Sequence, residues 1–154
     1  MSHNNENEII FPFPECSREL GEREINAYGP VTLAFIGDAV YSLLVREALV
    51  LSGDMTASAL HRESVKYVNA SFQSQMVRIL TDELTEQELS AFKRGRNAHS
   101  GHMPKNQSAA DYRYATGLEA LYGYLYLKND IDRMRYLFDI STKKYIGSKI
   151  DPEG

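Results

Sequence analysis

One stretch of the chain, residues 31–51, is apolar nearly all round, and this constrains the fold more than any other feature. Its large apolar side chains follow no single helical face, which is typical of a helix buried at the centre of a domain. Pro30 suits the first turn of such a helix, and Gly53 is placed to end it. The sequence therefore predicts a central helix against which the rest of the chain has to pack.

The remaining segments also show helical spacing, with apolar residues recurring every three or four positions. A capping residue stands before each of these runs. The expected helices begin at Asp54 or Thr56, at Thr85, at Ser108 and at Asp130, with a break in the first of them near Asn69.

No segment alternates strictly between apolar and polar residues, so no strand is predicted. Residues 98–107 contain Gly101 and Pro104 and have no period, which indicates a loop. The sequence thus predicts an all-α fold of five or six helices. We expect a single domain at residues 21–150, preceded by an N-terminal tail at residues 1–20.

The length of 154 residues is enough for one domain with a sizeable core. Cys16 is the single cysteine and cannot form an internal disulfide, so we expect a reducing, cytoplasmic location. No apolar run approaches the roughly 18 residues of a membrane span, and the N-terminus has no signal-peptide pattern. The formal net charge of -4 argues, taken alone, against a nucleic-acid partner.

That average hides a basic segment at residues 92–110, which carries Lys93, Arg94, Arg96 and Lys105 and no acid. Its local charge is +4, so the remainder of the chain carries -8. Such a segment, rich also in Gly, Ser and Asn, suits contact with phosphate oxygens. A helix end whose cations complement the helix dipole would explain Lys93 and Arg94 equally well.

Two carboxylates, Asp38 and Glu119, lie inside apolar helical segments. Burying an unpaired carboxylate is costly, so each needs a neighbouring cation, water or a bound metal. Glycines near both acids would let the two helices cross closely and bring the carboxylates together, as an oxygen-ligand site for Mg²⁺ requires. The alternative is that each acid is neutralised separately, Asp38 by Arg46 or Arg113, and the spacing in sequence leaves both interpretations open.

Three motifs resemble a known family. Residues 33–40, LAFIGDAV, are similar to the signature helix of ribonuclease III catalytic domains, and residues 116–123, TGLEALYG, are similar to their second acidic motif. The basic stretch 93–98, followed by residues 104–106 and 112–113, resembles the Mini-ribonuclease III subfamily. Members of that subfamily have the catalytic domain and no separate double-stranded-RNA-binding domain.

The resemblance covers residues 27–146 and implies an all-α, Mg²⁺-dependent endoribonuclease that acts as a homodimer on double-stranded RNA, leaving 5′-phosphate ends. It implies that Asp38 and Glu119 are the catalytic, metal-linked acids. Members of the Mini type trim the 23S ribosomal RNA precursor, and a ribosomal protein can assist them. The basic loop would then hold the RNA, through Lys93, Arg94, Arg96, Asn97, Lys105 and Asn106.

Full-length ribonuclease III enzymes carry two further metal-associated acids, and the matching positions here are Ala34 and Thr116. Mini-type sequences share this reduction, so it bears on the number of metal ions rather than on activity. Two other functions remain open: a catalytically inactive RNA-binding or ribosome-associated protein on the same fold, and a helical module that binds another protein. His99 and His102 do not have the spacing of zinc ligands, and we expect them to be exposed loop side chains.

Overall fold

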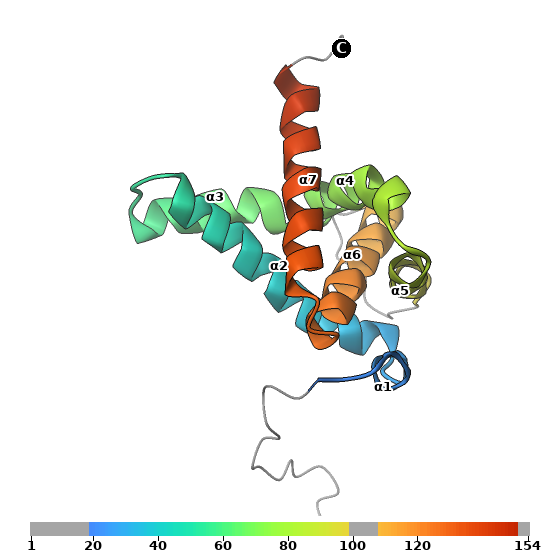
Figure 1. Cartoon of the computed structure of the whole chain (residues 1–154). Helices are drawn as coiled ribbons and strands as arrows, with labels where there is room; N and C mark the ends of the chain where they lie inside the picture. The colour runs from blue at the N-terminus through green and yellow to red at the C-terminus, as the bar shows by residue number, and fades with distance from the viewer. Residues whose placement is uncertain (1–18, 99–107, 151–154) are drawn as a thin grey trace, which may run out of the picture.

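The computed structural model describes residues 19–98 and 108–150, and all of their regular structure is helical (Figure 1). The helices are, in order, α1 (Glu22–Asn26), α2 (Pro30–Ser52), α3 (Ala57–Val68), α4 (Ala70–Leu80), the 3-10 helix η1 (Thr81–Glu83), α5 (Glu86–Arg96), α6 (Ala109–Leu127) and α7 (Ile131–Ile150). No strand occurs in the described ranges, and the predicted all-α fold is confirmed. Nearly all of the predicted N-terminal tail lies outside the described residues.

Side-chain caps begin several helices where the sequence predicts them. Asn69 separates α3 from α4: its backbone is extended (φ -80°, ψ 159°), and its Oδ1 accepts a hydrogen bond at 2.9 Å from an amide in the first turn of α4. Thr85 and Glu88 form the predicted capping box of α5. Thr56 and Ser108 cap α3 and α6 in the same way. Each cap satisfies an amide that the helix itself leaves without a partner.

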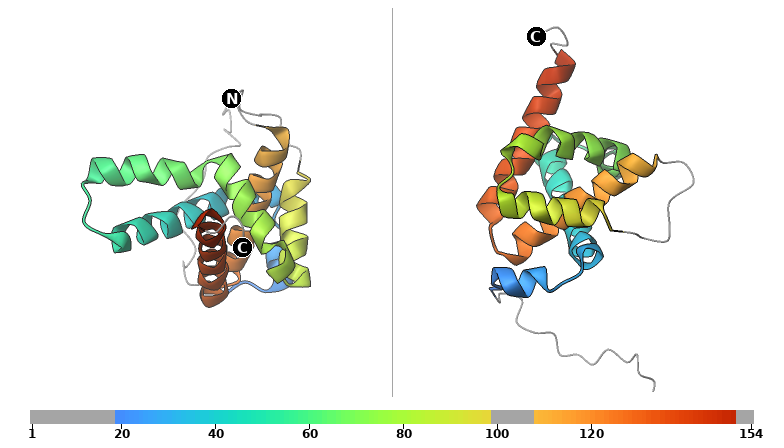
Figure 2. Two further views of the ribbon diagram at one scale, coloured as in Figure 1. Left: turned by 90° about the horizontal axis from the view of Figure 1, so that it is seen from above. Right: turned by 90° about the vertical axis from the view of Figure 1, so that its right-hand side faces the viewer.

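Helix α6 lies at the centre of the body, with α2, α4 and α5 packed around it (Figures 1 and 2). Its side chains Leu118, Leu121 and Tyr122 are completely buried. Tyr122 meets Tyr41 of α2 edge to face, with ring centres 5.7 Å apart. The core is therefore built on α6.

Helix α2 is buried on one side only, so the prediction of a helix buried all round is wrong for this chain by itself. Val31, Phe35, Leu43 and Val50 remain 49%, 83%, 63% and 60% exposed. These positions follow one another at helical spacing along a single stripe of α2, on the side away from α6. The all-round apolar pattern thus combines a core-facing side with a second apolar side that nothing in the described chain covers.

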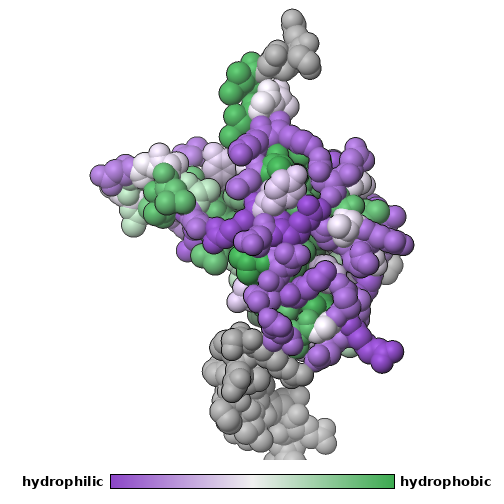
Figure 3. Space-filling view, in the orientation of Figure 1, coloured by the Kyte–Doolittle hydropathy of each residue, from purple (hydrophilic) through white to green (hydrophobic). Residues whose placement is uncertain are grey.

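Two parts of the molecule project from this body. Helices α2 and α3 form an arm, and the C-terminal part of α7 extends in a different direction (Figures 1 and 2). The face seen in Figure 3 is largely hydrophilic, with hydrophobic patches on the arm and near the end of α7. Among the described helices, none is both long and apolar enough to cross a membrane.

The contact between α2 and α6 depends on two glycines. A Cβ atom on Gly37 would lie 1.6 Å from the carbonyl oxygen of Glu119, and one on Gly123 would lie 2.0 Å from the carbonyl oxygen of Leu33. Only a residue without Cβ permits the two backbones to approach so closely. The approach places Asp38, which follows Gly37, beside the turn of α6 that carries Glu119.

We therefore expect Gly37→Ala to destabilise the protein by about 3 kcal/mol or more, because the new methyl group would force the two helices apart. Gly147→Ala is the matched control, since nothing lies within 4 Å of its Cβ position in α7. That change should stabilise the fold by up to about 1 kcal/mol through helix propensity. Urea unfolding of the two variants measures both effects, and equal stabilities would contradict the steric argument.

Candidate active site

The crossing of α2 and α6 brings the two predicted acids together. The Asp38 side chain is exposed, whereas the Glu119 side chain is partly buried. Burial, and to a smaller extent the negative charge of Asp38, raises the pKa of the Glu119 carboxyl to about 7. The two carboxylates therefore repel each other across the helix crossing.

No cation of the described chain neutralises this pair. Neither acid forms an ion pair there, so Arg46 and Arg113 are not the partners that a purely structural role would require. Glu88 provides the contrast, because this buried acid is 3% exposed and meets Arg133 at 2.9 Å. A buried acid with a structural role is thus paired in this fold, and the acid pair at the crossing is not.

Ala34 and Thr116 stand where full-length ribonuclease III enzymes carry two further acids, and no other carboxylate of the described chain takes their place. Ala34 is 4% exposed and lies one turn before Asp38 on α2. The hydroxyl of Thr116 donates to the carbonyl oxygen of Tyr112 at 3.0 Å, within its own helix. Within residues 19–98 and 108–150, no group of three or more His, Cys, Asp or Glu side chains could hold a metal. The chain offers two carboxylates at this site.

Gln73 of α4 is a further side chain at this site, which the sequence pattern did not single out. It is 2% exposed, and its amide slightly offsets the rise in the pKa of Glu119. Its Nε2 meets no acceptor at good hydrogen-bonding geometry in the described part of the chain, so it lies near the carboxyl without completing a bond. The available signal was its place on the helix, three residues after Ala70 and four before Val77, both of which are buried.

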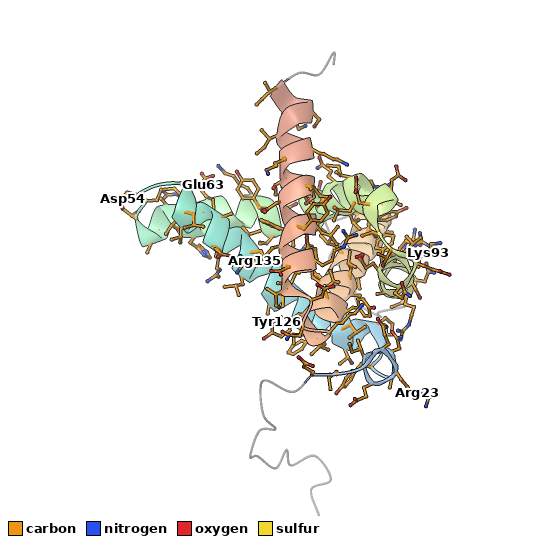
Figure 4. The ribbon with its side chains drawn as sticks, viewed as in Figure 1. Arg23, Asp54, Glu63, Lys93, Tyr126 and Arg135 are labelled. Carbon is orange, nitrogen blue, oxygen red and sulfur yellow. The ribbon has the colours of Figure 1, made fainter. Side chains whose placement is uncertain are left out.

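The structure divides the predicted RNA-binding residues into two kinds. Lys93 points away from the body on the outer side of α5 (Figure 4). Arg96, at the end of α5, donates to Asn97 Oδ1 at 3.1 Å and lies over the ring of Phe92. These three polar residues remain available at the surface.

Arg94 faces inward instead. One of its terminal nitrogens donates to the carbonyl oxygens of Tyr28 at 3.1 Å and Asn26 at 3.5 Å. It therefore holds the turn between α1 and α2 against α5. Lys105, Asn106, His99 and His102 lie outside the described residues.

The family model for the ribonuclease III domain matches residues 31–130. The chain belongs to the ribonuclease III family. Similar relatives include Mini-ribonuclease 3 from Thermoanaerobacter sp. (strain X514), 41% identical over 131 residues, which are 85% of this chain and 92% of that protein. Mini-ribonuclease 3 from Brevibacillus brevis is 45% identical over 112 residues, 73% of this chain and 84% of the relative.

A solved structure has a similar fold. The crystal structure of protein FN1578 from Fusobacterium nucleatum matches with a TM-score of 0.69 and 28% identity, covering 75% of this chain and 94% of that one. The resemblance predicted from the motifs is confirmed, and the protein is an endoribonuclease of the ribonuclease III type.

The raised pKa of Glu119 makes metal-free stability depend on pH. Its carboxyl binds a proton more tightly in the folded state (pKa about 7) than in the unfolded state (4.5), so folding stability falls as the pH rises between these values. We expect Glu119→Gln to remove this loss, and therefore to be more stable than the parent above pH 7, by up to about 3 kcal/mol. Near pH 4.5 the two proteins should be similar.

Urea unfolding across this pH range in EDTA measures the difference. Glu63→Gln is the control, because this glutamate lies on α3 and its ion pair within the described residues is with Lys66, at the surface. Its substitution should change stability by less than about 1 kcal/mol at each pH. Parallel pH profiles for the parent and Glu119→Gln would show that Glu119 titrates normally.

Proposed function

We propose that this endoribonuclease hydrolyses double-stranded RNA with Mg²⁺ held by Asp38 and Glu119. The observation that carries the proposal is the pair of carboxylates at the α2–α6 crossing, which repel each other and which no described cation neutralises. Two charges of one sign held close together are stabilised by a bound cation.

The donor set fits Mg²⁺. This ion is commonly bound by one or two carboxylates, with water and substrate phosphate oxygens completing its six ligands. Asp38 is exposed toward incoming RNA, and Glu119 lies deeper at the same crossing. When bound, the ion would lower the pKa of a water molecule and neutralise the charge that develops on the phosphodiester oxygens.

The chain's own residues then have separate tasks. The exposed Asp38 carboxylate accepts hydrogen bonds from the attacking water and orients it toward the phosphorus. Glu119 supplies the second negative charge from deeper in the crossing, where its side chain is partly buried near Gln73. Attack forms a bond from the water oxygen to phosphorus and breaks the bond to the 3′ oxygen. The attacking water loses a proton to solvent and the 3′ oxygen takes one from solvent, so the products carry a 5′-phosphate and a 3′-hydroxyl.

Double-stranded RNA is the substrate that the Mini-ribonuclease III resemblance favours, with the 23S ribosomal RNA precursor as the natural one, a ribosomal protein as helper and the cytoplasm as location. A-form RNA is recognised mainly by its shape, phosphates and 2′-hydroxyls. Lys93, Arg96 and Asn97, with Lys105 and Asn106 beyond the described residues, supply donors for such contacts. Incubation with structured precursor RNA, followed by mapping of the new ends, tests this substrate.

The uncovered stripe on α2 supports a homodimer. Phe35, 83% exposed, lies three residues from Asp38 on the same helix, so a second copy bound there would place two acid pairs close to one interface. Isologous contact through one helix face is the usual geometry of a twofold dimer. Each copy would then supply an active site for one strand.

We expect Asp38→Asn and Glu119→Gln each to reduce cleavage of a duplex RNA by at least about 100-fold, because each removes a charge that the transition state needs. Both variants should keep their fold by circular dichroism and should still bind the duplex. Glu63→Gln, an acid on the α3 arm, should cleave at the parental rate. Full activity in either active-site variant would refute the assignment.

Phe35→Ser should weaken self-association about 30-fold, as loss of a central aromatic contact does at interfaces. Sedimentation equilibrium measures the change. Ile150→Ser at the end of α7 is the control, since this side chain is also largely exposed (78%) but lies outside the stripe. A parent protein that is monomeric at micromolar concentration, or a Phe35 variant as dimeric as the parent, would exclude the proposed interface.

A further inference from the structure

Two arginine side chains lie over one tyrosine ring, and a third arginine lines the hollow beside that ring. Arg78 is in the last turn of α4, Arg96 is the last residue of α5, and Arg113 belongs to α6. The Cζ atom of Arg78 lies 3.9 Å from the centre of the Tyr114 ring, and that of Arg96 lies 6.0 Å from it. A hollow of about 450 Å³ is lined by Arg96, Asn97, Arg113 and Tyr114.

These guanidinium groups keep their positive charge uncompensated. None of the three arginines forms an ion pair with any residue in the described ranges. Asp111 lies two residues before Arg113, and Asp82 lies four residues after Arg78, yet neither acid forms an ion pair with any of the three arginines. By contrast, Arg133 and Arg135 are bound by glutamates at 2.9 Å and 2.7 Å. The cluster is therefore a local excess of positive charge on a chain whose net charge is -4.

Two of the arginines, Arg78 and Arg96, are also held in place before any ligand binds. Nε of Arg78 donates at 3.3 Å to the hydroxyl of a serine that is 1% exposed, and Nε of Arg96 donates at 3.1 Å to the side chain of the next residue. The Tyr114 ring is fixed in turn against Phe92, at 5.7 Å between ring centres. Guanidinium groups stacked on aromatic rings keep their planes fixed. Their terminal nitrogens have no acceptor among the described residues.

We propose that Arg78, Arg96 and Arg113 bind a backbone phosphate of the RNA other than the one that is cleaved. Planar guanidinium groups match phosphate oxygens two at a time, and the two that are already fixed, Arg78 and Arg96, lose little freedom on binding. Tyr114 and Glu119 lie five residues apart on α6, which is a rise of about 7.5 Å. The cluster is thus within reach of a strand whose scissile phosphate lies at the acid pair. The inference rests on the proposed function, because it takes RNA as the ligand.

The test is the salt dependence of duplex RNA binding by the full chain, measured by fluorescence anisotropy in EDTA so that no cleavage occurs. We expect the double variant Arg78→Gln, Arg113→Gln to bind about 10-fold more weakly. The slope of log affinity against log salt concentration should be smaller in magnitude by about 1 to 2. Arg135→Gln (Figure 4) is the control for loss of a guanidinium: it removes one positive charge, which Glu47 already pairs, and should change affinity by less than about twofold.

The tyrosine provides a second test. Tyr114→Phe keeps the ring that holds the arginines and should bind as the parent does. Tyr114→Leu keeps apolar packing without the aromatic face, and should weaken binding about threefold. Unchanged affinity and slope in the double arginine variant, or an equal loss in Arg135→Gln, would overturn the proposal.

Two further measurements separate this inference from the proposed function. With Mg²⁺, the double arginine variant should need about 10-fold more RNA than the parent to reach its half-maximal cleavage rate, because the change weakens RNA binding. If the parent cleaves no duplex RNA, the proposed function fails, and calorimetry with inorganic pyrophosphate then decides the anion site alone. Pyrophosphate binding that is present in the parent and lost in the double variant supports the site, whereas binding that is absent or unchanged overturns it.

Discussion

The close approach of α2 and α6 is the constraint on which the rest of the structure depends. It is possible only because Gly37 and Gly123 leave room for the backbone of the facing helix. The same approach determines which residues lie side by side, because Asp38 directly follows one of these glycines and Glu119 supplies the carbonyl oxygen that the other helix meets. The helix contact that packs the core therefore also brings the two acids together.

The acid pair works against stability. Burial and the neighbouring charge raise the pKa of Glu119 to about 7, so its ionised form is held at a cost that the rest of the core must offset. The buried Glu88 shows that the fold neutralises an acid where the role is structural, through Arg133. An uncompensated pair at a helix crossing is instead what a cation-binding catalytic centre requires.

The surroundings of each arginine, rather than its position in sequence, decide whether it holds the fold together or is available to a ligand. Arg94 and Arg96 are two residues apart, yet the first holds the α1–α2 turn through carbonyl oxygens and the second lies at a hollow beside Tyr114. Arg78 comes from a different helix and joins the second group. The RNA surface that we propose is thus an assembly of helix ends around α6, which a count of charges along the chain does not reveal.

The sequence by itself determined the helices and the residues whose side chains can take part in catalysis or binding. Local rules were sufficient there, because capping by Asn69 and Thr85 and the helical period act within a few residues. Only the tertiary structure decided that Asp38 and Glu119 meet, since 81 positions separate them and the contact depends on how two helices cross. It also decided that α2 leaves one apolar side uncovered and that Gln73 lies beside the acids. The physical reason is the same in each case: a side chain's neighbours across a helix interface are set by packing, which spacing along the chain does not encode.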